Sequence, residues 1–221
     1  MKVKIISITQ GVGEFKDKTA EDIIVYAARV SSPRKDKFES PEGLLKYCIN
    51  NKHWSIFETP SITFEIETSR AMGRQLLRHQ AKFQEFSQRY SEVTSFESFE
   101  LRKQADKNRQ SSTEVFDPII WDSEGKESGV LASEAIDDLL GQCKALYDEL
   151  ISKGVAKESA RFILPECAKT KMYMTNNLRN WIHFIQVRDD EHAQKEVREI
   201  AIEIKKVLKE YFPIVAKALG W

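Results

Sequence analysis

The chain has 221 residues, enough for one large domain or two small ones with a sizeable hydrophobic core. Its 34 Lys and Arg residues balance 34 Asp and Glu residues, so the overall charge favours neither nucleic acid nor an anionic membrane as partner. The 41% apolar and 31% charged residues exclude a wholly disordered chain. No apolar run approaches the ~18 residues of a membrane-spanning helix, and residues 1–10 resemble a strand more than a signal peptide. We therefore expect a cytoplasmic protein.

The sequence offers no metal-binding pattern and none of the common nucleotide-binding motifs. Cys48, Cys143 and Cys167 are odd in number and far apart, which favours buried free thiols over disulfides or a zinc site. His183 and His192 lack the i, i+4 spacing of a metal-binding helix. There is also no Walker loop, G-x-G-x-x-G fingerprint, G-x-S-x-G elbow or C-x-x-C pair.

The first half of the chain shows strand and helix patterns with clear helix starts. Thr19, Ser40 and Ser69 have the side chains of N-caps, and Pro41 suits a first helical position. Alternating apolar and polar residues predict a half-buried strand over 61–68. The predicted elements are a strand over 1–10, a helix from 19 to about Ser31-Ser32-Pro33, a helix over 40–50, the strand over 61–68, and a helix from 69 that includes Arg78 and His79.

The second half begins with an irregular stretch. Residues 92–130 have little periodicity and contain Asp117-Pro118 and Glu124-Gly125 as breakers, so we expect a surface excursion. Beyond it the pattern predicts helices over 133–153, a short helix before Pro165, a weak strand over 171–175, and helices over 176–187 and 191–212. These elements predict a single α+β domain over residues 1–221, with a small, mostly antiparallel sheet and several long helices.

A concentrated basic cluster stands out in this neutral chain. Arg70, Arg74 and Arg78 follow one another at i, i+4 and i+8, a spacing at which like charges repel on a helix. An anion, or carboxylates from elsewhere, between the arginines would explain the arrangement. A solvated basic face is the plainer alternative.

Residues 78–90 mix donors, one carboxylate, a hydroxyl and aromatics without helix or strand periodicity, as binding loops do. We expect Arg78 and Arg89 to hold Glu85 ionised, while Ser87 and nearby backbone N–H groups offer donors to a phosphate.

A second polar cluster lies towards the C-terminus. Arg179, His183 and Gln186 share one face of a predicted helix at i, i+4 and i+7. For His183 alone, an ordinary core or surface histidine is the commoner explanation. Arg161, Asn177, Arg188 and His192 belong to the same cluster in sequence.

Several ordered segments resemble the flavin-dependent thymidylate synthases. The family signature is Arg-His-Arg, seven residues and then Ser, usually continued as Asn/Gln-Glu-x-Ser-x-Arg-Tyr. Gln84–Tyr90 matches the second half, but Gln80 replaces the third residue of Arg-His-Arg and only six residues separate it from Ser87. The other matching segments are Ala28–Ser31, His53–Glu58, Arg74–Arg78, Ala160–Pro165, Asn177–Arg179 and Arg188–Gln194.

The resemblance implies a reaction and an assembly. The expected enzyme converts dUMP to dTMP, taking a methylene group from methylenetetrahydrofolate and reducing equivalents from NADPH through FAD. The resemblance also implies a homotetramer with FAD at subunit interfaces and dUMP stacked on the flavin. The expected partners are dUMP, folate and NADPH, without nucleic acid or membrane.

The resemblance also implies site residues. Arg188 is the expected catalytic residue, stabilising negative charge at nitrogen 3 of the pyrimidine. Ser87 is expected to bind and not to attack, because no histidine base is fixed beside it in sequence. The expected dUMP-binding residues are Gln75, Leu76, Leu77, Arg78, Glu85, Phe86, Ser87, Gln88, Arg89, Arg161 and Arg188. The expected FAD-binding residues are Ser55, Arg78, His79, Gln80, Glu85, Asn177, Leu178, Arg179 and His183, and no metal ligand is expected.

Two other interpretations remain open from the residues alone. A single-stranded nucleic-acid-binding protein could stack bases on Phe83, Phe86 and Tyr90 between the arginines. A helical interaction protein could use the long amphipathic segment 191–212 as an oligomer face. Steeply salt-dependent binding to single strands without bound flavin would favour the first.

The departure at Gln80 gives a testable prediction. An amide keeps hydrogen bonds but loses a charge, a difference of roughly 1–2 kcal/mol, and Lys82 can supply a nearby charge. We therefore predict that Gln80→Arg changes FAD affinity modestly or not at all, as measured by flavin titration. A gain on the order of several hundredfold would show that the flavin site of this chain is degenerate.

Overall fold

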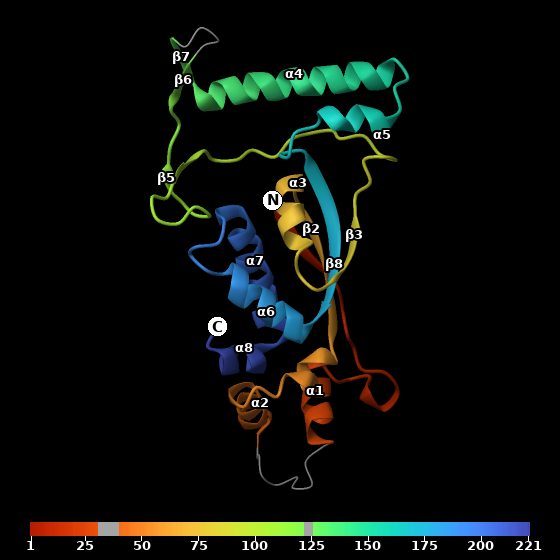
Figure 1. The fold of residues 1–221 in the computed structure, drawn as a ribbon. Helices are drawn as coiled ribbons and strands as arrows, with labels where there is room; N and C mark the ends of the chain where they lie inside the picture. The colour runs from red at the N-terminus through yellow and green to blue at the C-terminus, as the bar shows by residue number, and fades with distance from the viewer. Residues whose placement is uncertain (31–39, 122–125) are drawn as a thin grey trace.

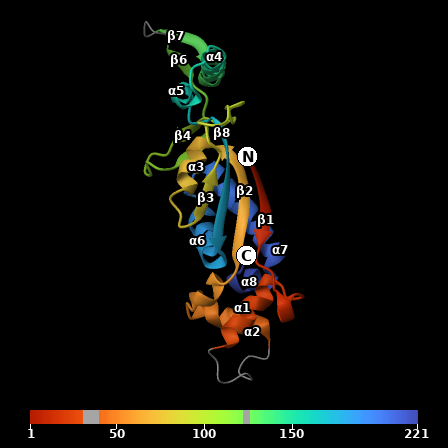
Figure 2. The ribbon, with the colours of Figure 1, turned by 90° about the vertical axis from the view of Figure 1, so that its right-hand side faces the viewer.

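The computed structural model describes residues 1–30, 40–121 and 126–221 and confirms the α+β class (Figures 1 and 2). Its main sheet is antiparallel throughout, as expected, with the strand order β1-β2-β8-β3. The four strands are β1 (Lys2–Ile8), β2 (Ser61–Ser69), β8 (Lys169–Asn177) and β3 (Lys82–Glu85).

Eight α-helices lie within the described ranges: α1 (Ala20–Arg29), α2 (Pro41–Asn50), α3 (Arg70–Leu76), α4 (Ala132–Ser152), α5 (Lys157–Ala160), α6 (Leu178–Arg188), α7 (Lys195–Tyr211) and α8 (Pro213–Leu219). Short 3-10 turns are η1 (Gly13–Phe15), η2 (Trp54–Glu58) and η3 (Arg161–Ile163). Within the described part of the chain, no helix is both long and apolar enough to cross a membrane.

The predicted N-caps are confirmed. Thr19 forms a capping box with Asp22, while the hydroxyls of Ser40 and Ser69 accept backbone N–H groups of α2 and α3. These bonds satisfy amides that lack a partner inside the helix. The predicted end of the first helix, Ser31-Ser32-Pro33, lies outside the described residues.

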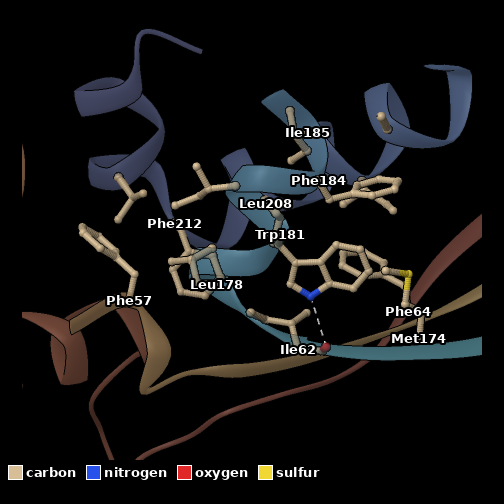
Figure 3. Close-up of a cluster of buried hydrophobic side chains, with 14 of the residues drawn as sticks. Phe57, Ile62, Phe64, Met174, Leu178, Trp181, Phe184, Ile185, Leu208 and Phe212 are labelled. Carbon is tan, nitrogen blue, oxygen red and sulfur yellow. Dashed lines mark hydrogen bonds between the residues drawn. The ribbon is translucent and has the colours of Figure 1, made fainter. Parts of the chain in front are cut away.

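The main core lies between the sheet and the C-terminal helices. Ile62, Phe64 and Ile66 of β2 are fully buried, whereas the alternate residues of the strand are not. Trp181 of α6 packs edge-on against Phe64, with ring centroids 5.0 Å apart, and its indole N–H donates to the Ile62 carbonyl at 3.2 Å (Figure 3). This bond satisfies a polar group in the core and fixes the start of α6 against the sheet.

The helix α4 belongs to a separate part of the molecule. Figure 1 shows α4 and α5 at one end and α1 and α2 at the other. In α4 only Tyr147 is buried, in a small second cluster with Val93, while Leu139 and Leu146 are 57% and 49% exposed. The periodicity predicts the helix correctly but not the surface on which it packs.

Several expected boundaries need correction. The excursion contains two hairpins, formed by β4 (Arg102–Gln104) with β5 (Ser112–Val115) and by β6 (Ile119–Trp121) with β7 (Glu127–Leu131), and the expected breaker at Glu124-Gly125 lies outside the described residues. Asn176 belongs to β8 and not to the following helix, because its backbone pairs with Ile62. The predicted helix over 191–212 begins at Lys195, and α8 follows because Pro213 disfavours helical geometry at Phe212.

A buried carboxylate joins the N-terminal helices to α8. Glu21 is 5% exposed, and its Oε1 accepts the N–H of Val215 at 2.7 Å in the first turn of α8. Burial raises the pKa of Glu21, and the α8 backbone hydrogen bonds oppose that effect only in part.

This shift predicts a pH-dependent effect of Glu21→Gln. Because the folded-state pKa is raised, the stability contributed by proton binding is complete below the unfolded pKa and is lost as pH rises through the folded value. Gln keeps an acceptor for Val215 and does not ionise. The difference in free energy of unfolding between Glu21→Gln and the wild type should therefore shift in favour of the variant as pH rises above the unfolded-state pKa of Glu21. Urea titrations at a series of pH values above that pKa measure the difference. The exposed Glu14→Gln is the control, and parallel curves for Glu21→Gln and wild type would contradict the prediction.

Candidate active site

The helix α3 presents two of the three predicted arginines. Arg70 Nη1 donates to Glu85 Oε1 at 3.0 Å, and Arg74 pairs with Glu166 at 3.0 Å. The spacing of the arginines indicated that an anion, or carboxylates from other parts of the chain, would lie between them. Glu85 and Glu166 are these carboxylates for Arg70 and Arg74. Arg78, however, lies beyond the end of α3 at Leu76, so the predicted stripe of three arginines is wrong at its third member. The helix ends there because the chain must turn to enter β3.

The segment 78–90 is not wholly a loop. Residues 82–85 form β3, since their backbone pairs with β8 from Lys82 opposite Thr175 to Glu85 opposite Met172. The strand places Glu85 beside α3. Sequence patterns missed it because its pairing partner lies about ninety residues away.

The expected partners of Glu85 are also wrong. Its Oε1 accepts hydrogen bonds from Arg70 and, at 2.8 Å, from Thr170, whereas Arg89 pairs with Glu158 at 3.3 Å. Gly73 lies beside this contact, and a Cβ at this position would meet Glu85 Oε1 at an ordinary van der Waals distance of 3.6 Å. Arg78 is not among the partners of Glu85.

The turn after α3 places His79 against the catalytic candidate. Arg188 Nε donates to His79 Nε2 at 2.8 Å, and the Phe184 ring lies edge-on to the imidazole, with centroids 4.8 Å apart. Burial, and then the charges of Arg188 and His183, lower the pKa of His79 to about 4. Burial and the charge of Arg78 also lower the pKa of Arg188. Two segments distant in sequence thus meet at a neutral imidazole beside a guanidinium group.

A cleft of about 470 Å³ runs along α6. The predicted helix face of Arg179, His183 and Gln186 lines it, and Arg179 forms an ion pair with Glu58 of η2. The complete lining is Trp54, Glu58, Gln80, Asn177, Arg179, Asn180, Ile182, His183 and Gln186. Guanidinium, imidazole and amide groups suit phosphate and ribose oxygens, and Trp54 and Ile182 add apolar surface.

The cleft contains only some of the residues expected to contact FAD. Ser55 is exposed on η2, beside the lining residue Trp54. The side chain of Leu178 is fully buried in the core, as is that of Leu76 among the expected dUMP contacts. Both residues are 0% exposed, backbone included, so neither offers a ligand any accessible surface in the single chain. Gln75 donates to Gln194 at the start of α7, and Leu77 is 45% exposed.

Asn176 is a site-organising residue that the sequence analysis missed. It is 8% exposed, its Nδ2 donates to the Gln80 carbonyl, and its Oδ1 accepts from Asn177 N at 3.0 Å and from Asn180 Nδ2 at 2.9 Å. One amide therefore fastens the turn after α3 to the start of α6. The signal was a polar residue at a buried position of an alternating strand.

A second polar cleft, of about 380 Å³, lies at the other end of β3. Its basic residues are Arg70, Arg74 and Arg161, and Gln88 is 7% exposed beside them. Three guanidinium groups around one cleft suit a phosphate. Phe162, Leu164, Pro165 and Glu166 complete the lining.

The two clefts do not merge into one site within a chain. Asn176 holds Gln80 at one end of β8, whereas Phe86 donates its backbone N–H to Lys171 near the other end. At ~3.3 Å per residue, the stretch of β8 from Lys171 to Asn176 separates the two ends by roughly 17 Å. Arg188 therefore lies at one end and Arg161 at the other. Arg161 and Arg188, which are both expected to contact dUMP, therefore do not meet within one chain.

The aromatic residues of this segment do not form a stacking row. Phe83 packs against the main core and Phe86 against the second cluster, while Tyr90 is 80% exposed. The structure therefore does not favour the nucleic-acid interpretation.

Comparisons with known proteins identify a family and relatives for this chain. A family model described as thymidylate synthase complementing protein matches residues 15–214. The chain is 42% identical over 227 residues to a probable flavin-dependent thymidylate synthase of Paramecium bursaria Chlorella virus 1 and 43% identical over 226 residues to the flavin-dependent thymidylate synthase of Synechocystis sp., with 100% of both chains covered in each case.

Among solved structures, the chain resembles a UMP/dUMP methylase, PolB, from Streptomyces cacaoi, crystallised with 5-Br dUMP. The TM-score is 0.77 at 24% identity, covering 99% of this chain and 94% of the other. At this identity the likeness establishes a shared fold.

The role of Asn176 can be tested with Asn176→Asp. The carboxylate keeps the acceptor for Asn177 but cannot donate to the Gln80 carbonyl, and it places a charge against that oxygen. We expect faster amide hydrogen exchange in residues 77–81 and a loss of about 1–3 kcal/mol in stability. The control is Asn51→Asp at the exposed end of α2. Unchanged exchange in 77–81 would contradict the fastening role.

Proposed function

The chain belongs to the family of flavin-dependent thymidylate synthases, and from this premise we propose which of its residues convert dUMP to dTMP with methylenetetrahydrofolate, NADPH and FAD. The proposal depends on one observation, the meeting of His79 in the family signature with Arg188 from the end of α6. An arginine in this position can stabilise negative charge that develops on a bound pyrimidine. No enzyme nucleophile is needed for that role.

We place the flavin along α6. Arg179 and His183 would contact the pyrophosphate, with Gln80 and Asn177 donating or accepting at neighbouring polar atoms. Glu58 already pairs with Arg179, so a bound phosphate would share or replace this partner. FAD supplies the hydride chemistry when bound, and the chain orients it and excludes competing water. The donor set of the cleft fits this cofactor.

We place the nucleotide phosphate at the second cleft, where Arg161 lies close to Gln88. Ser87 and Arg89 follow on the same segment, and the Ser87 Oγ accepts the N–H of Arg89 at 3.4 Å. Arg89 is paired with Glu158 on the exposed surface and is free to exchange that partner for a phosphate at little cost.

A nucleotide held by both clefts requires more than one chain. Because Arg188 and Arg161 lie at opposite ends of β8, one chain would provide the pyrimidine contacts and another the phosphate contacts. This supports the homotetramer expected for the family. The exposed apolar residues Leu139 and Leu146 of α4 offer a surface for such assembly.

The most informative experiment is the visible spectrum of the purified protein. We expect the bands of oxidised flavin, and we expect dUMP to perturb them. Conversion of dUMP to dTMP should require methylenetetrahydrofolate and NADPH together. A colourless protein that does not take up added FAD would end the proposal.

The catalytic assignment predicts the effect of Arg188→Ala. Loss of a preorganised positive charge should lower dTMP formation by about 10²–10³-fold or more while flavin remains bound. Product formation and the flavin spectrum are measured on the same preparation. Arg109→Ala, on the hairpin between β4 and β5, is the control. Full turnover by Arg188→Ala would show that the assignment is wrong.

A further inference from the structure

We propose that His79 is a positioning residue for Arg188: its Nε2 accepts the Arg188 Nε–H and thereby aims the guanidinium group at the pyrimidine. The inference deepens the proposed function, on which the role of Arg188 depends. It gives His79 a task separate from the cofactor contact expected from the family.

The imidazole is held on several sides. Its Nε2 lies 2.8 Å from Arg188 Nε, and the Phe184 ring meets it edge-on at an interplanar angle of 80°. Phe184 is itself buried and stands at 90° to Trp181, which is fixed to β2. The backbone N–H of His79 donates to the Leu76 carbonyl at 3.0 Å. The acceptor therefore has little freedom to follow a moving arginine.

The chemistry of the pair determines which ring nitrogen of His79 carries the proton. A guanidinium group has donors and no acceptor, so Nε2 must carry the lone pair and the neutral imidazole must carry its proton on Nδ1. The groups that act on this histidine electrostatically, Arg188 and His183, are basic, and together with burial they keep it neutral at physiological pH. Nδ1–H then remains available as a donor.

The bond to His79 leaves the terminal guanidinium nitrogens of Arg188 available to a ligand. With Nε committed to His79, the two terminal nitrogens keep four N–H groups for a ligand. A side-on bond at Nε also restricts rotation of the guanidinium plane, which lowers the entropy lost when a substrate is gripped. A neutral acceptor does this without cancelling the charge that stabilises a pyrimidine anion.

The first test compares His79→Leu with His79→Gln in flavin-loaded enzyme. Leu removes the acceptor, and we expect kcat to fall about 10- to 100-fold, the loss of a hydrogen bond to a charged group, with a smaller change in the KM for dUMP. Gln places its amide oxygen close to the position of Nε2 and should recover most of the loss. Melting temperatures and flavin content show whether each variant folds and loads.

A double-mutant cycle isolates the pair. Arg188→Lys keeps a positive charge but lacks Nε, so His79→Leu should lower kcat by a much smaller factor in that background than in the wild type. Single-turnover rates of dTMP formation by flavin-loaded enzyme give the two factors. Equal effects in the two backgrounds, or no recovery with Gln, would overturn the proposal. Loss of flavin with unchanged kcat in the loaded fraction would show a cofactor contact only.

A third readout does not depend on activity. The chain has only four histidines, so ¹⁵N-histidine NMR can resolve each ring. We expect His79 to be neutral with its proton on Nδ1 near pH 7, and its Nε2 signal to shift in Arg188→Lys. A ring protonated on Nε2 would overturn the proposal. If the wild type made no dTMP and bound no flavin, the proposed function would fail, while this measurement would still decide whether the bond exists.

Discussion

The backbone pairing of β8 with its two neighbours is the constraint on which both clefts depend. Along one side β8 pairs with β2 over the whole strand, and along the other it holds the short β3. At its end, Asn177 caps α6 and begins the polar face of the first cleft. Near its start, Thr170 bonds Glu85 beside the second cleft. A break in this ladder would therefore disturb both sites.

The separation of the two clefts follows from the geometry of β3 and is the reason why we propose that more than one chain holds the nucleotide. A strand is extended, so β3 sets the signature residues before it apart from those after it. His79 and Ser87 are close in sequence but are carried to opposite ends of the strand. In the assembly that we propose, complementary ends of different chains would meet and restore the convergence that the sequence pattern indicated.

The sequence predicted those features that depend on local chemistry. The caps at Thr19, Ser40 and Ser69 and the polar face of α6 follow from short-range hydrogen bonding and helical periodicity. It failed where partners come from far along the chain. Glu85 is bound by Arg70 and Thr170 because β3 is registered on β8, and no local pattern encodes that register. Asn176 was missed for the same reason, since its task is to hold a carbonyl ninety-six residues away in sequence.

The arginines differ in how their charge is balanced, and the difference matches their proposed tasks. Arg70, Arg74, Arg89 and Arg179 each pair with a carboxylate. A carboxylate next to Arg188 would compete with an anionic pyrimidine and reduce the field that acts on it. His79 instead supplies a neutral lone pair, which fixes direction and leaves the charge in place. Arg188 is half-buried beside this neutral acceptor; burial and the charge of Arg78 lower its pKa, and a negatively charged ligand would oppose that effect. In the proposed mechanism, the positive charge of Arg188 would thus favour the state with negative charge on the substrate.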